Sequence, residues 1–331
     1  MARGHRNVLP FVAGRLAQGL IVMFTVATLV FVLLHAAPGD PLTSLSEQPR
    51  ITPEVVSRMR QNFGLDQPIP IQYLRYLGNL ARGDLGISYT QHRPVVQAIR
   101  EAIPNTLLLA TVALLIDFGL GTLVGIAQGT RPGSATDRTL SGVTITLYSM
   151  PVFWLGLLLM FVFGERLGWF PIAGVTNPVT YPYASLAGKL FDRMHHLILP
   201  ALALGLVSAG YTARHQRSAM LEAIRQDCVR TARAKGLRER AVVMRHALRN
   251  ALLPTITLAG LAFPVLLSGA VLIETVFAWP GLGKLAADAV GRRDYPVVTG
   301  AAILAAAMVV VGNLLADVAT RLIDPRTRTA A

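Results

Sequence analysis

Charge is scarce in this sequence. Charged residues make up 15% of its 331 residues, whereas soluble domains carry roughly 25%, and hydrophobic residues make up 53% with a mean hydropathy of +0.49. A single cysteine, Cys228, excludes an internal disulfide framework. The sequence has no G-x-x-x-x-G-K-[ST] loop for phosphate, and no Ser/His/Asp or Cys/His set stands out. We therefore expect an all-α membrane protein that is not an enzyme and holds no cofactor of its own.

The few charges that are present are mostly basic. The formal net charge is +13 and the isoelectric point is near 10.8, which by itself could indicate a nucleic-acid partner. No zinc-finger spacing or RNA-binding signature accompanies the charge, and the basic residues lie beside apolar segments. We expect no nucleic-acid partner, and contact with membrane lipid instead.

Apolar segments long enough to cross a bilayer recur along the chain. The first has 19 residues without a charge, or roughly 28 Å of helix. That length exceeds the usual apolar core of a cleaved signal peptide, and the residues after it make a poor cleavage site. The sequence predicts six transmembrane helices: Leu16–Leu34, Thr106–Gln128, Leu140–Phe163, Leu197–Ala213, Leu252–Phe277 and Val297–Ala316.

The distribution of Arg and Lys between the connecting segments predicts the orientation. With the amino terminus inside, the inner segments hold 18 basic residues in 77 positions and the outer segments hold 13 in 119. Cytoplasmic loops are enriched in basic residues, so we expect both termini to be cytoplasmic.

A long polar segment follows the first span, on the outer side. It has a proline-initiated helix start at Pro53, a short helix over Ile69–Leu80 ending near Gly83, and several turn-rich stretches. We interpret Asp40, Asp66 and Asp84 as turn and cap residues rather than substrate contacts.

The most basic stretch is Arg214–Pro254, which holds ten Arg or Lys residues and three acidic ones. Such charge cannot lie in lipid, so the stretch is predicted to be an aqueous loop. Met220, Ile224, Cys228 and Ala232 recur every four positions and predict one amphipathic helix, broken by Gly236 before a second short helix from Arg238. We interpret this loop as a docking helix for a partner; a basic loop held only by anionic lipid is the alternative.

Two motifs in this stretch carry a family resemblance. RTARAKGL at Arg230–Leu237 and HALRN at His246–Asn250 resemble the cytoplasmic coupling motif of ABC-importer permeases of the dipeptide, oligopeptide and nickel group, B-type subunit. Other stretches are similar to the same family: PGDP (38–41), GLDQP (64–68), RGDLGISY (82–89), SMPVFW (149–154), ETVFAWPGLGKL (274–285), RRDYPVV (292–298) and DPR (324–326).

This resemblance implies a type I importer permease in a bacterial or archaeal cytoplasmic membrane. It implies the segments 1–35 (tail and first helix), 36–98 (extracytoplasmic), 99–324 (permease domain, coupling loop 214–250) and 325–331 (tail). The implied partners are a second permease subunit, two ATPase subunits that hold ATP and magnesium, and an extracytoplasmic solute-binding protein. The implied solute is a short peptide; nickel chelates, glutathione and opines are alternatives. The ATPase-coupling residues implied are Arg230, Thr231, Ala232, Arg233, Ala234, Lys235 and Gly236.

Ionisable residues within the spans are further candidates. Asp117 lies in mid-span, where it would serve the pathway or, more in keeping with its surroundings, a polar contact between subunits. Glu274 near the outer end of the fifth span would serve a gate or, more simply, reach the interface or cap a turn. Asp317 is placed to pair with Arg321. His195 and His196 lack the further ligands of a metal site.

Two other classes remain open from the residues alone. A secondary transporter would need intramembrane carboxylates or ion sites in paired halves, for which Asp117 by itself is thin support. A membrane scaffold that binds a partner without transport would also explain the basic loop.

Overall fold

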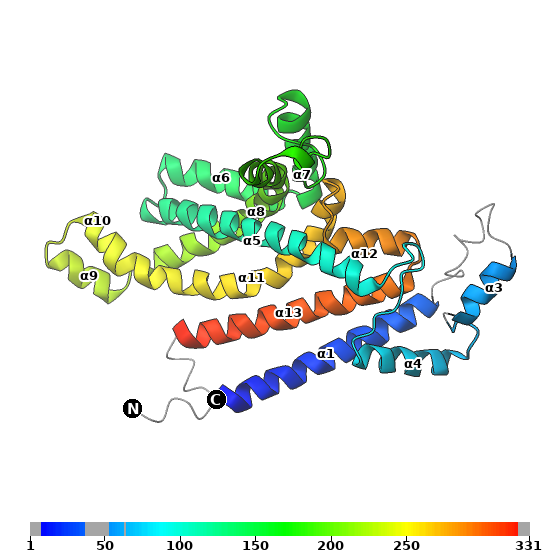
Figure 1. Ribbon diagram of the computed structural model, residues 1–331. Helices are drawn as coiled ribbons and strands as arrows, with labels where there is room; N and C mark the ends of the chain where they lie inside the picture. Colours follow the sequence, from blue (N-terminus) through cyan, green and yellow to red (C-terminus); the bar gives the residue numbers. More distant parts are fainter. Residues whose placement is uncertain (1–7, 37–52, 63, 324–331) are drawn as a thin grey trace. The chain divides into compact units, whose positions relative to one another are not determined.

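The computed structural model describes residues 8–36, 53–62 and 64–323 (Figure 1). Across these residues the regular structure is helical, apart from an isolated bridge between Ile87 and Pro94. The chain divides into two compact units. The first comprises Met1–Asn105 with Gly281–Val310, and the second Thr106–Pro280 with Val311–Ala331. The division runs within two long helices, α5 (Val95–Thr130) and α13 (Tyr295–Ile323). The boundaries expected from the sequence stay predictions.

The first unit contains the amino-terminal helices. Besides the beginnings of α5 and α13, its helices are α1 (Val8–Ala36), α3 (Pro53–Asn62), α4 (Ile69–Ala81) and α12 (Leu282–Gly291). Polar groups in the middle of α4 bind it to α1: the hydroxyls of Thr28 and Tyr73 are 2.7 Å apart, and Tyr76 donates to the carbonyl of Ala27. Burial raises the pKa of Tyr76 to about 12, so its hydroxyl keeps the proton that it donates. The helix predicted over Ile69–Leu80 is confirmed.

A buried carboxylate joins two of the quoted motifs in this unit. Asp294, from RRDYPVV, is 1% exposed. Its oxygens accept the hydroxyls of Ser88 and Thr90 at 2.5 and 2.7 Å and the backbone N–H groups of Tyr89 and Thr90 at 3.1 and 3.0 Å. A charged acceptor surrounded by donors is well satisfied. The stretch RGDLGISY and the stretch RRDYPVV therefore meet in one polar contact.

Turn chemistry explains the other aspartates of the outer segment. Asp84 accepts the N–H of Gly86 through its side chain, as a turn residue does. Asp66 is bonded by the neighbouring Gln67 side chain. Asp40 lies outside the described residues.

The second unit is built around α8 (Leu186–Ile224). Its other helices are the remainders of α5 and α13, α6 (Ala135–Ser149), α7 (Val152–Leu159), α9 (Asp227–Ala234), α10 (Glu239–Ala241) and α11 (Leu248–Val276). It also has π-helical segments at Met160–Arg166 and Val242–Ala247 and a 3₁₀ turn at Tyr181–Tyr183. The apolar core gathers side chains from α5, α7, α8 and α11, including Leu109, Leu155, Leu204 and Ile273. Because α8 is buried by helices around it, its position determines where the residues after it emerge.

Glycines on α5 allow α8 to pack closely against it. Gly121, Gly125 and Gly129 are four residues apart and therefore share one face of the helix. A Cβ atom on Gly121 would lie 2.7 Å from Cβ of Thr212, and one on Gly125 would lie 2.6 Å from the carbonyl oxygen of Ala213. Real Cβ atoms do not approach that closely, so the two backbones pack at a distance that only glycine allows.

Most of the predicted spans are confirmed. Within the described residues, four helices are long and apolar enough to cross a membrane: Gly14–Ala36, Val95–Thr130, Leu186–Ile224 and Tyr295–Leu314. A bent pair would make a fifth. The fifth predicted span, Leu252–Phe277, coincides with α11, whose backbone is helical but whose side chains are described only in part. The full count of six stays a prediction.

The span predicted over Leu140–Phe163 is broken at Pro151. The chain bends by 106° between α6 and the segment Val152–Arg166. Pro151 has no N–H with which to continue the α6 hydrogen-bond ladder, and it forces the preceding residue out of the helical region. Met150 accordingly has an extended ψ of 136°.

Candidate coupling site

The basic stretch begins as a continuation of α8. The helix runs to Ile224, Gln226 is extended, and α9 then starts at Asp227. The prediction of one amphipathic helix through Met220, Ile224, Cys228 and Ala232 is therefore wrong: the first two belong to α8 and the last two to α9. Cys228 is exposed, so it is not part of the apolar face. Four-residue spacing continued across the break and concealed it.

An apolar cluster anchors this region to the end of α8. Met220 and Ala223 of α8 pack with Val229 and Ala232 of α9 and with Val242 beyond α10, all at most 3% exposed. Among the coupling residues that the resemblance implies, Ala232 thus has its methyl group in this internal cluster, whereas Ala234 and Gly236 are exposed.

Gly236 closes α9 with a left-handed turn. Its φ is +74°, and the N–H groups of Gly236 and Leu237 donate to the carbonyls of Arg233 and Ala232 at 2.9 and 3.4 Å. This is the Schellman pattern, in which glycine after the C-cap satisfies the last carbonyls of a helix. The predicted helix break at Gly236 is confirmed. No atom lies within 4 Å of a Cβ built on Gly236, so the turn is open to an incoming surface.

An ion pair spans this turn. Arg233 donates to both carboxylate oxygens of Glu239, at 3.1 and 2.6 Å. The hydrogen bonds from Arg233 hold the pKa of Glu239 below its usual value. The charge of Arg233 is thus paired within the chain. Arg230 also has a carboxylate nearby, since its Nη1 lies 3.5 Å from Oδ1 of Asp227. Both arginines, which the resemblance implies as coupling residues, therefore have a carboxylate partner within the chain.

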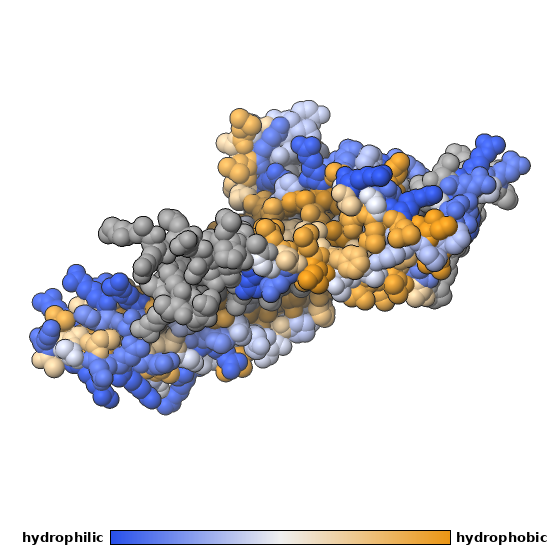
Figure 2. Space-filling view, turned by 90° about the horizontal axis from the view of Figure 1, so that it is seen from below, coloured by the Kyte–Doolittle hydropathy of each residue, from blue (hydrophilic) through white to orange (hydrophobic). Residues whose placement is uncertain are grey.

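The uncompensated positive charge lies slightly further along. Lys235, Arg238 and Arg240 are exposed, and the described part of the chain places no carboxylate within ion-pair distance of them. Leu237 between them is 44% exposed. Figure 2 shows the surface of the α9 and α10 end to be mainly hydrophilic. The exposed end of the segment therefore offers three cations around one apolar side chain.

The HALRN motif holds the C-terminal end of the loop in place. Asn250, the last residue of HALRN, donates its side-chain amide to Oε1 of Gln226 at 2.8 Å and lies 3.7 Å from the sulfur of Cys228. The first turns of α11 are thereby tied to the turn between α8 and α9. Both ends of the loop are held, so it has a defined shape.

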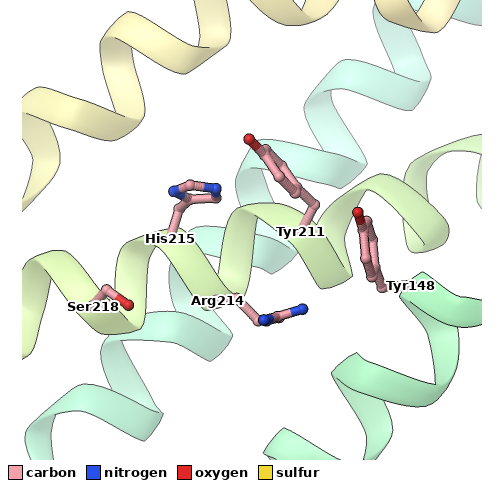
Figure 3. A pocket seen from close by; sticks show the side chains of 5 residues that line it. All are labelled: Tyr148, Tyr211, Arg214, His215 and Ser218. Atoms are coloured by element: carbon pink, nitrogen blue, oxygen red, sulfur yellow. The ribbon is translucent and has the colours of Figure 1, made fainter.

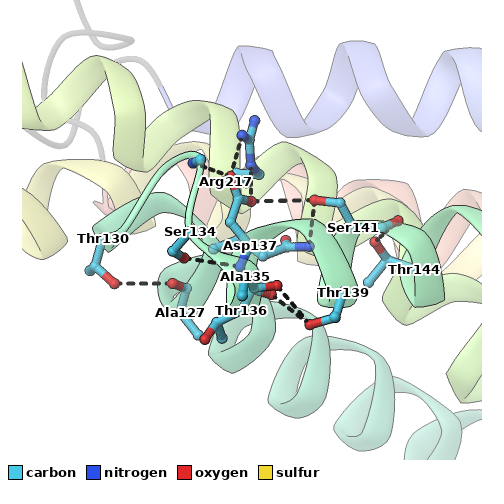
Figure 4. A network of polar contacts seen from close by, with 12 residues as sticks. Ala127, Thr130, Ser134, Ala135, Thr136, Asp137, Thr139, Ser141, Thr144 and Arg217 are labelled. Carbon is cyan, nitrogen blue, oxygen red and sulfur yellow. Dashed lines mark hydrogen bonds and ion pairs between the residues drawn. The ribbon is translucent and has the colours of Figure 1, made fainter.

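A buried aspartate connects α8 to the turn before α6. Asp137 accepts Nε and Nη2 of Arg217 at 2.8 and 2.9 Å, the N–H of Gly133 at 2.9 Å and the hydroxyl of Ser141 at 3.3 Å (Figure 4). Ser134 caps α6 by accepting the N–H of Asp137. This bidentate pair fixes α8 two turns before it ends at Ile224.

Sequence reasoning did not single out this pair. The pattern Ser134-x-x-Asp137 after a glycine is a helix-start signal and could have located the aspartate on α6. Its partner Arg217 is 80 residues away, and nothing local connects the two. The glycine repeat of α5 was likewise readable as a small-residue stripe.

The intramembrane carboxylates are bonded within the chain. Asp117 of α5 accepts the hydroxyl of Thr212 of α8 at 2.6 Å, and both residues are 2% exposed. The predicted contact between subunits is therefore wrong, and the contact is internal. Glu274 is fully buried and accepts the hydroxyl of Thr106 at 2.6 Å. Its carboxylate stays in the core, where it holds α11 against α5. It does not extend to the membrane–water interface as a snorkelling side chain does.

The paired histidines have local partners. Nε2 of His195 lies 2.7 Å from the carbonyl of Trp169, and Nδ1 of His196 lies 2.8 Å from that of Asp192. Among the described residues no group of three or more His, Cys, Asp or Glu side chains could hold a metal ion. The predicted pair of Asp317 and Arg321 lies outside the described side chains.

These features define a class of protein: a multi-pass helical membrane protein whose central helix ends in an exposed, internally braced basic segment. The family comparison agrees. Residues 121–329 match the model of the binding-protein-dependent transport system inner membrane component, and residues 8–110 match the N-terminal model of the same systems. The chain belongs to this family of transport permeases, and the resemblance carried by RTARAKGL and HALRN is confirmed.

Curated relatives match over nearly the whole chain. The Di/tripeptide transport system permease protein DppB of Pseudomonas aeruginosa (strain UCBPP-PA14) is 41% identical, with 97% of this chain and 99% of the relative covered. The Oligopeptide transport system permease protein AppB of Bacillus subtilis (strain 168) is 40% identical, with 96% and 98% covered. The Dipeptide transport system permease protein DppB of Escherichia coli (strain K12) is 38% identical, with 97% and 99% covered.

Solved structures share the fold. A chain of the MetNI methionine ABC transporter in an inward-facing conformation superposes with a TM-score of 0.55 at 20% identity, covering 69% of this chain and 97% of that one. A chain of an amino acid ABC transporter gives a TM-score of 0.51 at 14% identity. At these identities the likeness concerns the fold alone, and the expected importer-permease fold is confirmed.

Proposed function

We propose that this chain is the B-type permease subunit of an ATP-driven importer of short peptides. The observation that carries the proposal is the similarity, over 95% or more of the chain, to relatives named as di/tripeptide, dipeptide and oligopeptide permeases. Nickel chelates, glutathione and opines are the alternative solutes.

The proposed assembly contains a second permease subunit, two ATPase subunits with ATP and magnesium, and an extracytoplasmic solute-binding protein. The excess of basic residues in the inner segments supports a cytoplasmic position for both termini and for the basic segment. In this orientation Lys235, Arg238 and Arg240 face the cytoplasm, where an ATPase with an acidic cleft would meet them.

Coupling would run from the exposed turn to the spans. Ala234 and Gly236 permit close approach at the turn, and the cluster around Ala232 transfers displacement of α9 to the end of α8. Arg217 then carries the displacement to α6 through Asp137. The ion pair of Arg233 with Glu239 and the apolar cluster around Ala232 hold α9 and α10 together against the end of α8, so these helices would move as a unit. ATPase closure would therefore rotate or shift α8 rather than bend the loop.

Co-expression with the neighbouring transport genes, purification and reconstitution test the assembly and its solute. We expect the ATPase subunits and a second permease to copurify, and vesicles with the binding protein to accumulate radiolabelled dialanine only with ATP. Copurification without dialanine uptake, but with uptake of nickel chelates, glutathione or an opine, would replace the solute. Absence of any ATPase subunit would indicate a secondary transporter or a scaffold.

A substitution at Gly236 tests the coupling segment. Asparagine tolerates left-handed φ better than other side chains, so Gly236→Asn adds bulk at the open turn while retaining its shape. We expect ATP hydrolysis to continue with dialanine uptake reduced about tenfold or more. Gly168→Asn is the matched control, since Gly168 also has positive φ and free space around its Cβ position. Equal coupling in the two variants would refute the docking role of the turn.

A further inference from the structure

A pocket of about 280 Å³ opens on the surface of the second unit, at the N-terminal end of the basic stretch Arg214–Pro254. Tyr211, Arg214, His215 and Ser218 line it from successive turns of α8, and Tyr148 lines it from α6 (Figure 3). All five residues are exposed. None of them belongs to α9, to α10 or to the turn between these helices, and none takes part in the contact between Asp137 and Arg217.

The lining has the chemistry of an anion site. The guanidinium carbon of Arg214 lies 5.8 Å from the centre of the Tyr148 ring, and no carboxylate in the described part of the chain is within ion-pair distance of it. The ring of Tyr211 lies 6.0 Å from that of Tyr148 and 4.3 Å from that of His215. A guanidinium with free donors binds a carboxylate through two parallel hydrogen bonds. Because no acidic side chain lines the pocket, it does not suit a cationic ligand.

The position of the lining on α8 indicates that the pocket faces water. The stretch Tyr211–Ser218 presents its polar side chains three and four residues apart, on one helix face, while Ala213 and Gln216 are buried under α5. An exposed charge in a span is tolerated where it lines an aqueous path. The exposed face of α1, by contrast, carries residues such as Leu20 and Phe24, as a face toward lipid does.

We propose that this pocket holds the C-terminal carboxylate of the transported peptide, with Arg214 as the carboxylate-binding residue. The inference rests on the proposed function. Tyr148 and Tyr211 provide ring surfaces for the adjoining peptide atoms, and Ser218 provides a further donor. In the proposed orientation Arg214 directly follows the span Leu197–Ala213, so the pocket lies at the cytoplasmic end of the transport pathway. The peptide would occupy it just before release into the cytoplasm.

Protection of an engineered cysteine tests occupancy directly. Ser218→Cys is introduced in a Cys228→Ser background, and the whole complex is placed in nanodiscs, which leave both faces accessible. The rate of modification by a maleimide is measured with dialanine or with dialanine amide, which lacks the carboxylate. We expect dialanine to slow modification at least threefold and the amide to leave the rate unchanged.

A second substitution identifies the binding group. Arg214→Gln should abolish the protection by dialanine. Arg131→Gln is the matched control, because Arg131 is an exposed arginine of the α5–α6 turn outside the pocket, and it should leave the protection intact.

Several results would overturn the inference. These are a cysteine that never reacts, protection that is absent, protection equal for the amide, or protection that survives Arg214→Gln. If nanodiscs of phosphatidylglycerol slow modification relative to phosphatidylcholine while dialanine does not, a lipid headgroup occupies the pocket and the inference is wrong. Dialanine uptake by the same complex is measured in parallel, so uptake without protection refutes the pocket alone. Protection without uptake refutes the peptide importer and leaves a carboxylate site.

Discussion

The close packing of α5 on α8 gives a sharp prediction, because α5 carries two glycines with opposite surroundings. A Cβ atom on Gly125 would lie 2.6 Å from the carbonyl oxygen of Ala213 and from Cβ of Gln216, whereas one on Gly119 meets no atom within 4 Å. The obstructing atoms are a backbone carbonyl and a first side-chain carbon, which cannot rotate away. Gly125→Ala therefore requires the two helices to separate.

The expected magnitude follows from comparing the two variants. Replacing glycine by alanine inside a helix is favourable by about 1 kcal/mol, and this gain applies to both positions. Overpacking costs about 1–3 kcal/mol, and it applies to Gly125 alone. The difference in unfolding free energy between Gly125→Ala and Gly119→Ala should therefore be about 1–3 kcal/mol, with Gly119→Ala the more stable.

Unfolding in mixed micelles, followed by tryptophan fluorescence and by helical circular dichroism, measures this difference. The matched substitution on one helix cancels effects of helix propensity and of the detergent. If Gly125→Ala proved as stable as Gly119→Ala, the glycine stripe would not set the distance between α5 and α8.

Three further predictions concern polar contacts. Asp137→Asn should lower the temperature of thermal unfolding, and Arg217→Gln added to it should lower it no further, because the two side chains act as one pair; additive losses would contradict this. Asp294→Asn should destabilise the protein by about 1.5–3 kcal/mol in an SDS titration, since hydrogen bonds to a buried charge are lost; an unchanged midpoint would refute the buried-carboxylate reading. The pair of Arg233 and Glu239 stabilises the turn at pH values above the ordinary glutamate pKa of roughly 4.3, and because the folded-state pKa of Glu239 is lowered, that support is lost as the pH falls through it. Amide exchange at the turn, corrected for intrinsic rates, should accelerate on acidification in the wild type but not in Glu239→Gln.

Local signals predicted several elements well. The α4 helix and the break at Gly236 depend on proline, glycine and apolar spacing within a few residues, and both are confirmed. The same kind of signal failed at the start of the basic segment. A four-residue period carried the predicted helix from Met220 to Ala232 across the extended residue Gln226, since spacing alone does not register a backbone that changes direction.

The roles of the charged side chains were less predictable. Arg233 and Lys235 look alike in the sequence, yet one is held by Glu239 and the other is exposed without a described ion partner. The internal bonds of Asp117 to Thr212 and of Glu274 to Thr106 depend on which residues of α5, α8 and α11 lie at the same depth. Helix-to-helix register is a property of packing, and no window of sequence contains it.

The sequence by itself determined that the chain is a helical membrane protein and where most of its spans lie, because the cost of placing charge or an unbonded backbone in lipid acts on each segment separately. Its motifs also indicated the family. Only the tertiary structure decided the 106° bend at Pro151, the burial of Ala232, the pairing of Asp137 with Arg217 and the pocket around Arg214. These depend on the approach of helices far apart in the chain, which is set by side-chain volume and hydrogen-bond geometry at the contact.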